Sequence, residues 1–186
     1  MTAAASQPDY LIKRQESLLV VIDAQERLLP VIEGREAVVE NIVRLVRFAR
    51  IIGLPTVVTE QDKLGATVEP ISSQLEACEP IPKVTFDSFG CPRFKDRLAQ
   101  MAPQNLILAG VEAHICVAQT ALGGLEEYNI QVVSDAVSSR VPANRQVALD
   151  RMARAGAVIT STEMVIYELL VQAGTDEFRS VLPLVK

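Results

Sequence analysis

The stretch that decides the fold is NLILAGVEAHICVAQTALGGLE at residues 105–126. Residues 106–109 (LILA) are apolar without alternation, as is typical of a parallel strand covered on both faces. We expect a sharp turn at Gly110, followed by a helix in which apolar residues recur at close to a helical period. Cys116 therefore lies in or near the first turn of that helix, just past the carboxyl end of a strand.

Two interpretations of Cys116 stay open at this point. A helix N-terminus presents free N–H groups and a partial positive charge, which favour a thiolate and suit a catalytic nucleophile. A lone cysteine in an apolar helix is, however, more often a small buried hydrophobe. The local segment favours burial slightly, so other parts of the chain have to decide.

The composition predicts one globular domain, residues 1–186, with an N-terminal extension at 1–16 and a tail at 175–186. A chain of 186 residues can bury about 70% of its extended surface in one core. The net charge of −5 and the lack of a basic cluster argue against nucleic acid as a partner. No apolar run reaches the roughly 18 residues of a membrane span, so no membrane partner is expected.

The cysteine count and the missing nucleotide motifs predict a cytoplasmic protein without a cofactor. Cys78, Cys91 and Cys116 lack metal-ligand spacing and read as reduced thiols, and the N-terminus has no signal-peptide core. The single histidine, His114, excludes a His-rich metal site. Neither G-x-G-x-x-G nor G-x-x-x-x-G-K-[ST] occurs, so NAD and ATP binding are not expected.

Strands and helices alternate along the chain. Strands are predicted at residues 18–22, 55–59, 81–86, 106–109, 130–133 and 157–160. Helices are predicted at residues 37–52, 71–77, 92–101, past Cys116, 142–155, and from a cap at Ser161 or Thr162 to about 173, with a further short helix in the tail. The alternation favours a three-layer α/β/α sandwich with a six-stranded, mostly parallel sheet in the order 3-2-1-4-5-6. That order brings the carboxyl ends of the first and fourth strands to one crevice.

Asp23 and Lys83 are the charged residues that this topology could bring to Cys116. Asp23 ends the first strand in VVIDAQ, where it is either an ordinary cap or a general base for the cysteine. Lys83 lies in the short strand IPKVTF. It is either an edge-strand lysine that blocks aggregation or a cation that keeps the carboxylate charged and neutralises developing anion.

The other polar candidates favour structural roles. His114 lies two residues before the cysteine, and near neighbours in one turn usually point apart, so a packing role is preferred to a dyad. Gly123 and Gly124 inside the helix indicate close packing against a neighbouring element or subunit. Asp135 and Glu163 read as caps rather than catalysts.

Four segments together resemble the isochorismatase-like cysteine hydrolase superfamily. They are VVIDAQ at 20–25, PKVTFDSF at 82–89, GVEAHICV at 110–117 and VVSDAVSSR at 132–140, and the resemblance runs from about residue 17 to 168. Within the superfamily, TEQ at 59–61 followed by KLGATV at 63–68 is similar to the isochorismatase domain-containing proteins.

The resemblance implies a catalytic triad and an oxyanion site. It makes Asp23 the general base, Lys83 the electrostatic partner and Cys116 the nucleophile. It also implies a non-proline cis peptide at Val111–Glu112, which would aim the N–H of Glu112, with that of Cys116, at the developing oxyanion.

Two departures from family patterns narrow the activity. Nicotinamidases of the superfamily hold a metal with an Asp-x-His pair and another histidine, whereas residues 59–62 (TEQD) contain no histidine. Metal-dependent nicotinamidase activity is therefore not expected. True isochorismatases typically lack the nucleophilic cysteine, so the presence of Cys116 favours attack on a carbonyl carbon.

We therefore expect a cofactor-independent hydrolase of a small-molecule C–N (amide-type) bond, acting through a thioester. Isochorismatase-type vinyl-ether hydrolysis and a non-catalytic binding or scaffold role stay open as alternatives. Family habit and the Gly123-Gly124 pair predict a homo-oligomer, a dimer or a tetramer. Candidate pocket residues, chosen by position beside the triad segments, are Gln25, Leu28, Gln61, Phe86, Phe89, Ile115 and Gln119.

Overall fold

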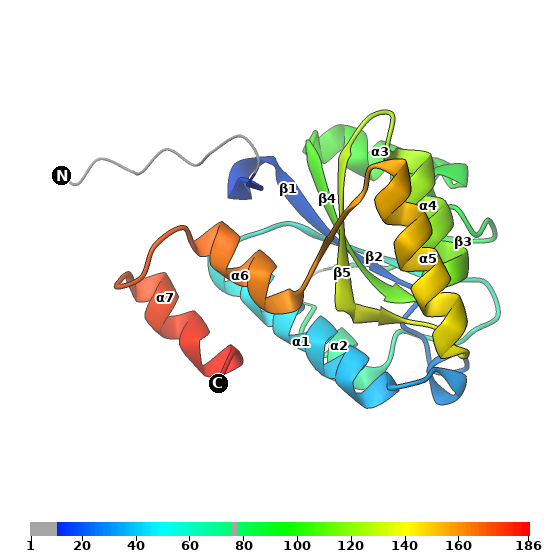
Figure 1. Ribbon diagram of the computed structural model, residues 1–186, viewed down its shortest axis with the longest axis horizontal. Helices are drawn as coiled ribbons and strands as arrows, with labels where there is room; N and C mark the ends of the chain where they lie inside the picture. The colour runs from blue at the N-terminus through cyan, green and yellow to red at the C-terminus, as the bar shows by residue number, and fades with distance from the viewer. Residues whose placement is uncertain (1–10, 76–77) are drawn as a thin grey trace.

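Six parallel strands form one sheet in the computed structural model, which describes residues 11–75 and 78–186 (Figure 1). The strands are β1 (Ser17–Ile22), β2 (Thr56–Gln61), β3 (Ile81–Lys83), β4 (Asn105–Val111), β5 (Asn129–Ser138) and β6 (Val158–Thr160). Their order is β3-β2-β1-β4-β5-β6, and every neighbouring pair is parallel. The predicted α/β/α sandwich with strand order 3-2-1-4-5-6 is confirmed.

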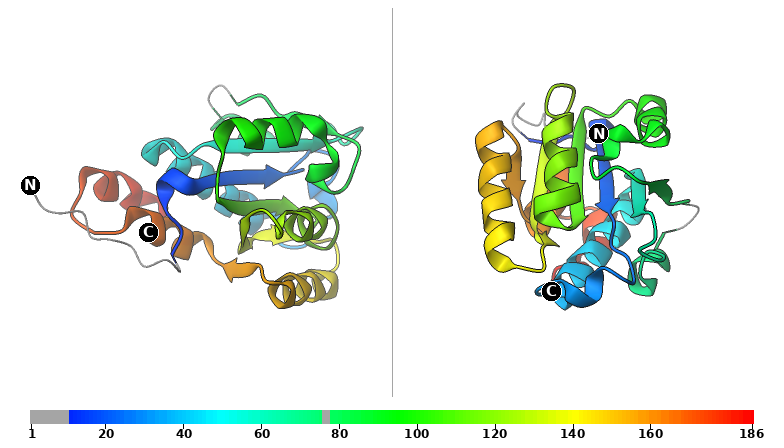
Figure 2. Two further views of the ribbon diagram at one scale, coloured as in Figure 1. Left: turned by 90° about the horizontal axis from the view of Figure 1, so that it is seen from above. Right: turned by 90° about the vertical axis from the view of Figure 1, so that its right-hand side faces the viewer.

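Helices cover both faces of the sheet, as Figures 1 and 2 show. One face packs against α1 (Arg35–Ile52), α2 (Glu69–Ser72), α6 (Thr162–Leu170) and α7 (Asp176–Val181). The other face packs against α3 (Pro92–Met101), α4 (Ala118–Gly124) and α5 (Pro142–Ala155). Each face therefore has its own hydrophobic core, with the sheet between the two.

The strands β1 and β4 lie at the centre because they are apolar on both faces. Every residue of both strands is buried. Alternate β1 side chains enter the two cores: Leu18 and Val20 face α3, α4 and α5, whereas Leu19 and Val21 face α1. Because the two strands are parallel neighbours, their carboxyl ends emerge side by side at one edge of the sheet.

The predicted turn at Gly110 is wrong, because Gly110 lies inside β4 and the strand continues to Val111. Gly110 is paired with Ile22 and has a φ of +119°. A Cβ added there would lie 2.0 Å from the carbonyl oxygen of Ile22. The glycine thus permits a close approach of β1 and β4 rather than a turn. The chain turns after Val111 into a π-helical turn, Ala113–Val117, which leads into α4.

Several predicted boundaries differ from those of the structure. β5 continues past residue 133 to Ser138, so Asp135 lies within the strand rather than after it. The helix predicted at 71–77 is the shorter α2, and positions 76–77 lie outside the described residues. The helix expected to reach about 173 ends at Leu170, because Val171 adopts a φ of +64°. Of the predicted extension, residues 1–10 lie outside the described part, and Arg14–Glu16 form a 3₁₀ turn.

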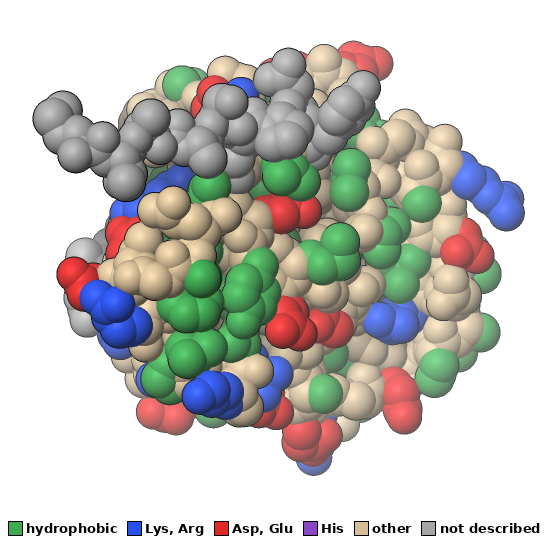
Figure 3. Space-filling model, turned by 60° about the vertical axis from the view of Figure 1, so that its left-hand side comes forward, with side chains coloured by type: hydrophobic (Ala, Val, Ile, Leu, Met, Phe, Trp, Pro, Cys, Tyr) green, Lys and Arg blue, Asp and Glu red, His purple; other side chains and the backbone are tan. Residues whose placement is uncertain are grey.

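Figure 3 looks onto the side of the molecule that carries α6 and α7, where hydrophobic and charged side chains are interspersed. Met164 and Tyr167 of α6 are among the exposed large hydrophobic residues. None of the helices that the structure describes is long and apolar enough to cross a membrane. The candidate catalytic residues Asp23, Lys83 and Cys116 lie elsewhere, at the carboxyl edge of the sheet.

Candidate active site

The carboxyl edge of the sheet brings Asp23 and Lys83 into direct contact. Asp23 follows the last residue of β1, and Lys83 is the last residue of β3. The Lys83 Nζ atom lies 2.7 Å from Asp23 Oδ2, and both side chains are fully buried. An ion pair at this depth is stable only with further hydrogen bonds to both partners.

The ammonium group of Lys83 uses its three hydrogens within the protein. Besides Asp23, it donates to Gln61 Oε1 at 2.9 Å and to the carbonyl oxygen of Thr85 at 3.2 Å. An ammonium has three donors and no acceptor. Lys83 is therefore held in place by three acceptors of the protein, and its charge lowers the pKa of the neighbouring Cys116 thiol.

The second oxygen of Asp23 is held by Thr59, a residue that the sequence reasoning missed. The Thr59 hydroxyl donates to Asp23 Oδ1 at 2.8 Å, and the backbone N–H of Asp23 donates to the Thr59 carbonyl at 3.1 Å. Thr59 pairs with Ile22 in the β1–β2 register. A polar residue at the carboxyl end of the strand next to Asp23 was the available signal.

Cys116 lies beside this pair as a protonated thiol. Its side chain is 5% exposed and belongs to the π-helical turn. Burial, followed by the charge of Asp23, raises the pKa of the Cys116 thiol to about 12, and Lys83 opposes this rise. The resting state is therefore the neutral thiol rather than the thiolate that a helix N-terminus would favour.

The side chain of Glu112 is anchored by Arg140. Its carboxylate accepts hydrogen bonds from the Arg140 backbone N–H at 2.9 Å, Nε at 3.2 Å and Nη2 at 2.9 Å. The peptide bond Val111–Glu112 is cis. Arg140 lies within one of the family-like segments, but nothing in the sequence pairs it with Glu112.

Two of the candidate pocket residues, Gln25 and Gln61, are engaged in building the site. Gln25 accepts from the Gln61 backbone N–H at 2.8 Å and donates to the carbonyls of Gln61 at 3.0 Å and Gly65 at 2.6 Å. Gln61 in turn binds Lys83 and donates to the Val84 carbonyl at 2.9 Å. These amides hold the loop after β2 against the Asp23–Lys83 pair.

The apolar pocket candidates separate into packed and open positions. The Phe89 ring packs edge-on against Phe94, with centroids 5.3 Å apart, and stacks on Tyr128 at 5.7 Å. The structure therefore makes Phe89 a packing residue. Among the others, Leu28 and Ile115 pack against the two cores, and Phe86 and Gln119 are exposed.

His114 and the two glycines have structural roles. His114 Nδ1 lies 2.9 Å from Ser139 Oγ, so the ring bonds toward β5 and α5 rather than forming a cysteine dyad. A Cβ on Gly123 would lie 2.8 Å from an Asp87 oxygen, and one on Gly124 would lie 2.8 Å from the Phe89 ring. The glycines therefore pack closely against a neighbouring segment of the same chain.

Asp135 caps α6 from the neighbouring strand. Its Oδ1 accepts from the backbone N–H of Thr162 at 2.8 Å and from the Thr162 hydroxyl at 2.9 Å. Ser161 is the N-cap of the same helix, and Glu163 lies in its first turn. The capping interpretation of Asp135 thus holds, although the residue belongs to β5.

The carboxyl end of β2 does not fit the metal site of the nicotinamidases. Glu60 Oε1 accepts from both the backbone N–H and the hydroxyl of Thr67 at 2.7 Å, so this carboxylate is occupied. Gln61 is bound to Lys83. Among residues 11–75 and 78–186, no three His, Cys, Asp or Glu side chains gather as metal ligands do.

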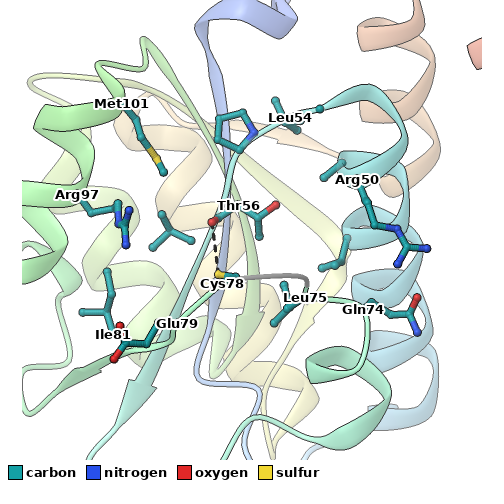
Figure 4. A pocket seen from close by; sticks show the side chains of 15 residues that line it. Arg50, Leu54, Thr56, Gln74, Leu75, Cys78, Glu79, Ile81, Arg97 and Met101 are labelled. Atoms are coloured by element: carbon teal, nitrogen blue, oxygen red, sulfur yellow. Dashed lines mark hydrogen bonds between the residues drawn. The ribbon is translucent and has the colours of Figure 1, made fainter.

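A separate cavity of about 320 Å³ lies at the opposite edge of the sheet (Figure 4). It is bounded by α1, α3 and the amino ends of β2 and β3. Its Cys78 thiol donates to the Thr56 carbonyl at 3.5 Å, and burial raises the pKa of that thiol. Neither Asp23, Lys83 nor Cys116 lines this cavity, so it does not serve the chemistry at the carboxyl edge.

Sequence comparisons match the chain to a family model and to proteins whose names contain the word isochorismatase. The family model described as "Isochorismatase domain" matches residues 17–164. The chain is 38% identical to the "Secreted isochorismatase effector Isc1" of Phytophthora sojae, over 91% of this chain and 84% of that protein. It is 36% identical to "Isochorismatase domain-containing protein 2" of Danio rerio, over 89% and 84% of the two chains. These matches confirm the resemblance indicated by the four sequence segments.

Solved structures share the whole architecture. The structure of Mar1 ribonuclease from Caenorhabditis elegans superposes with a TM-score of 0.89 at 37% identity, covering 94% of this chain and 92% of that one. YcaC from Escherichia coli, described as an octameric hydrolase of unknown specificity, superposes with a TM-score of 0.88 at 23% identity, covering 96% and 92%. The likeness to YcaC concerns the fold alone.

Proposed function

The chain belongs to the isochorismatase family, and from that premise we propose that it is a cysteine-dependent hydrolase of a C–N bond in a small amide. The observation that carries the proposal is the buried Asp23–Lys83 pair beside the protonated thiol of Cys116. A carboxylate held charged next to a neutral thiol is the arrangement that general-base activation of a nucleophile needs.

The first half-reaction forms a thioester. The Cys116 sulfur attacks the amide carbonyl carbon while Asp23 takes the thiol proton, so the thiolate forms only as the new bond forms. The N–H groups of Glu112 and Cys116 stabilise the oxyanion. Asp23 then gives its proton to the leaving nitrogen, and the C–N bond breaks to release ammonia or an amine.

The second half-reaction returns the enzyme to its starting state. Asp23 takes a proton from water, whose oxygen attacks the thioester carbonyl carbon. The carbon–sulfur bond breaks, the carboxylic acid leaves, and the sulfur recovers a proton from Asp23. Throughout, Lys83 holds Asp23 Oδ2 in place through the 2.7 Å contact of its Nζ atom.

Isochorismatase-type vinyl-ether hydrolysis is the second candidate, favoured by the name of the Phytophthora sojae relative. That reaction does not require a cysteine nucleophile. The two candidates therefore predict opposite outcomes when Cys116 is replaced. RNA cleavage, which the name of the Caenorhabditis elegans protein raises, is disfavoured for this chain by its net charge of −5.

The test is a substrate panel assayed with the unchanged protein, Cys116→Ala and the control Cys78→Ala. The panel contains small aliphatic and aromatic amides, isochorismate and a short RNA, with products identified by mass spectrometry. We expect amide hydrolysis that is lost in Cys116→Ala and kept in Cys78→Ala. Full turnover of isochorismate by Cys116→Ala would replace the amide proposal with vinyl-ether hydrolysis. No turnover of any member, together with tight binding of one, would favour the scaffold role.

A further inference from the structure

Thr59 contacts Asp23 through both its backbone and its side chain. Its carbonyl accepts the Asp23 N–H, and its hydroxyl donates to Asp23 Oδ1 at 2.8 Å. Both residues are fully buried. A hydrogen bond from a hydroxyl to an ionised carboxylate is among the stronger protein hydrogen bonds, and its loss in a buried site is costly.

The position of Thr59 does not need a hydroxyl for packing. The two preceding residues of β2 are Val57 and Val58, and valine has nearly the shape of threonine. Valine in place of Thr59 would fill the same space without the donor to the carboxylate. The hydroxyl is thus the part of this side chain that the Asp23 contact requires.

β2 supplies the contacts that fix both members of the ion pair. Thr59 and Gln61 are two residues apart and therefore project to the same side of the strand. Thr59 binds Asp23, and Gln61 binds Lys83 at 2.9 Å. Asp23 Oδ1 is held by Thr59 and Oδ2 by Lys83, so the plane of the carboxylate is set from two sides.

Asp23 also has a backbone conformation that needs external support. Its φ is +51°, a region that residues other than glycine seldom adopt. The backbone bond from Asp23 N–H to the Thr59 carbonyl helps to hold it there. The carbonyl of Thr59 therefore helps to fix the backbone of Asp23, and its hydroxyl helps to fix the orientation of the Asp23 carboxylate.

Resting on the proposed function, we propose that Thr59 is a positioning residue that aims the Asp23 carboxylate at the reacting proton. It touches no substrate and acts only through Asp23. Its effect is greatest on proton transfer, since general-base catalysis depends on the distance and alignment of the base. Binding of the substrate should depend on it little.

The step that isolates this role is hydrolysis of the acyl-enzyme. The probe is p-nitrophenyl acetate: the Cys116 sulfur takes the acetyl group, the ester bond breaks, and p-nitrophenol leaves with the thiol proton. Water then attacks the thioester while Asp23 takes one of its protons, the carbon–sulfur bond breaks, acetic acid leaves, and Asp23 returns its proton to the sulfur. The rate of deacylation, followed by the loss of 42 mass units from the acetylated protein, does not require the Cys116 thiol to lose a proton first, because its sulfur is already acylated.

The variants are Thr59→Val, which removes the donor, and Thr59→Ser, which keeps it. We expect Thr59→Val to slow deacylation about tenfold or more, and Thr59→Ser to stay within about threefold of the unchanged protein. Asp23→Asn should slow the step about a hundredfold or more. If Thr59→Val does not fold, Thr59→Ala lacks the donor without adding volume and takes its place.

Thr162→Val is the matched control. Thr162 is also a buried threonine whose hydroxyl donates to an aspartate, Asp135, at 2.9 Å, but it lies at the start of α6. We expect it to lower the melting temperature without changing the deacylation rate. Deacylation by Thr59→Val within twofold of the unchanged protein, with Asp23→Asn slowed, would overturn the role of Thr59. Failure of p-nitrophenyl acetate to acylate Cys116, or an unimpaired Asp23→Asn, would instead contradict the proposed function.

Discussion

At the scale of single residues, the neutral state of Cys116 decides how the chemistry must proceed. A thiol with a pKa near 12 is almost fully protonated at pH 7, so the resting protein holds no ready nucleophile. Asp23 contributes to the raised pKa and is the group that accepts the proton in the proposed mechanism. Slow reaction of the resting thiol with alkylating agents is therefore compatible with catalysis.

The raised pKa predicts how alkylation of Cys116 depends on pH. The thiolate fraction should rise about tenfold for each pH unit from pH 7 to 10, because this whole interval lies below the folded-state pKa. The rate of iodoacetamide labelling, assigned to Cys116 by peptide mapping, measures this dependence. A rate that levels off at or below pH 8 would contradict the neutral resting thiol.

The buried ion pair predicts a large stability effect when one partner is removed. Lys83→Met leaves the Asp23 carboxylate buried without its cation, and we expect the free energy of unfolding to fall by about 3–5 kcal/mol. The double variant Asp23→Asn/Lys83→Met should recover part of this loss. Urea unfolding at pH 7 measures both.

The control for this prediction is Lys63→Met, since Lys63 pairs with Asp62 at 3.9 Å on the surface. Its unfolding midpoint should stay nearly unchanged, because exposed ion pairs contribute little. Equal effects of Lys63→Met and Lys83→Met would show that the buried pair has no special role in stability.

At the scale of elements, the close contact of β1 and β4 depends on one position. The apolar strands themselves could be predicted from their runs of hydrophobic residues, but Gly110 was read as a turn. A glycine gives the same local signal in a turn and at a close backbone approach. Only the pairing of Gly110 with Ile22, distant in sequence, distinguishes the two.

Gly110→Ala should therefore destabilise the protein strongly, by about 4 kcal/mol or more, because its Cβ would meet the Ile22 backbone at 2.0 Å. Gly156→Ala is the control. Gly156 has a similar φ of +114° but nothing within 4 Å of an added Cβ, so only the backbone cost of about 1–3 kcal/mol applies. Thermal unfolding of the two variants compares them, and equal losses would contradict the close-approach account.

At the scale of the whole molecule, the strand order could be derived from the sequence, and with it the crevice between β1 and β4. The side-chain contacts that complete the site could not be derived from the sequence. Thr59 reaches Asp23, and Arg140 reaches Glu112, across segments that are far apart in the chain. Neither local propensity nor periodicity carries information on such side-chain pairs, and the pKa of Cys116 depends on a burial that only the folded chain defines.

The predicted homo-oligomer is also a property of the whole molecule. The Gly123-Gly124 pair no longer supports this prediction, since both glycines pack against residues of the same chain. The octameric state is given for Escherichia coli YcaC, whose likeness to this chain concerns the fold alone. We expect light scattering at micromolar concentration to give the mass of a dimer or a tetramer. The mass of a monomer would contradict the predicted homo-oligomer.

The cytoplasmic location stays a prediction, since one relative is named a secreted effector.

The most direct test of the central claim is the mass of the Cys116 peptide from protein quenched during turnover of the best amide in the panel. The account predicts an acyl adduct on Cys116 that forms on mixing and disappears as the carboxylic acid accumulates. Sustained amide turnover with Cys116 unmodified, together with undiminished activity of Cys116→Ala, would contradict the account.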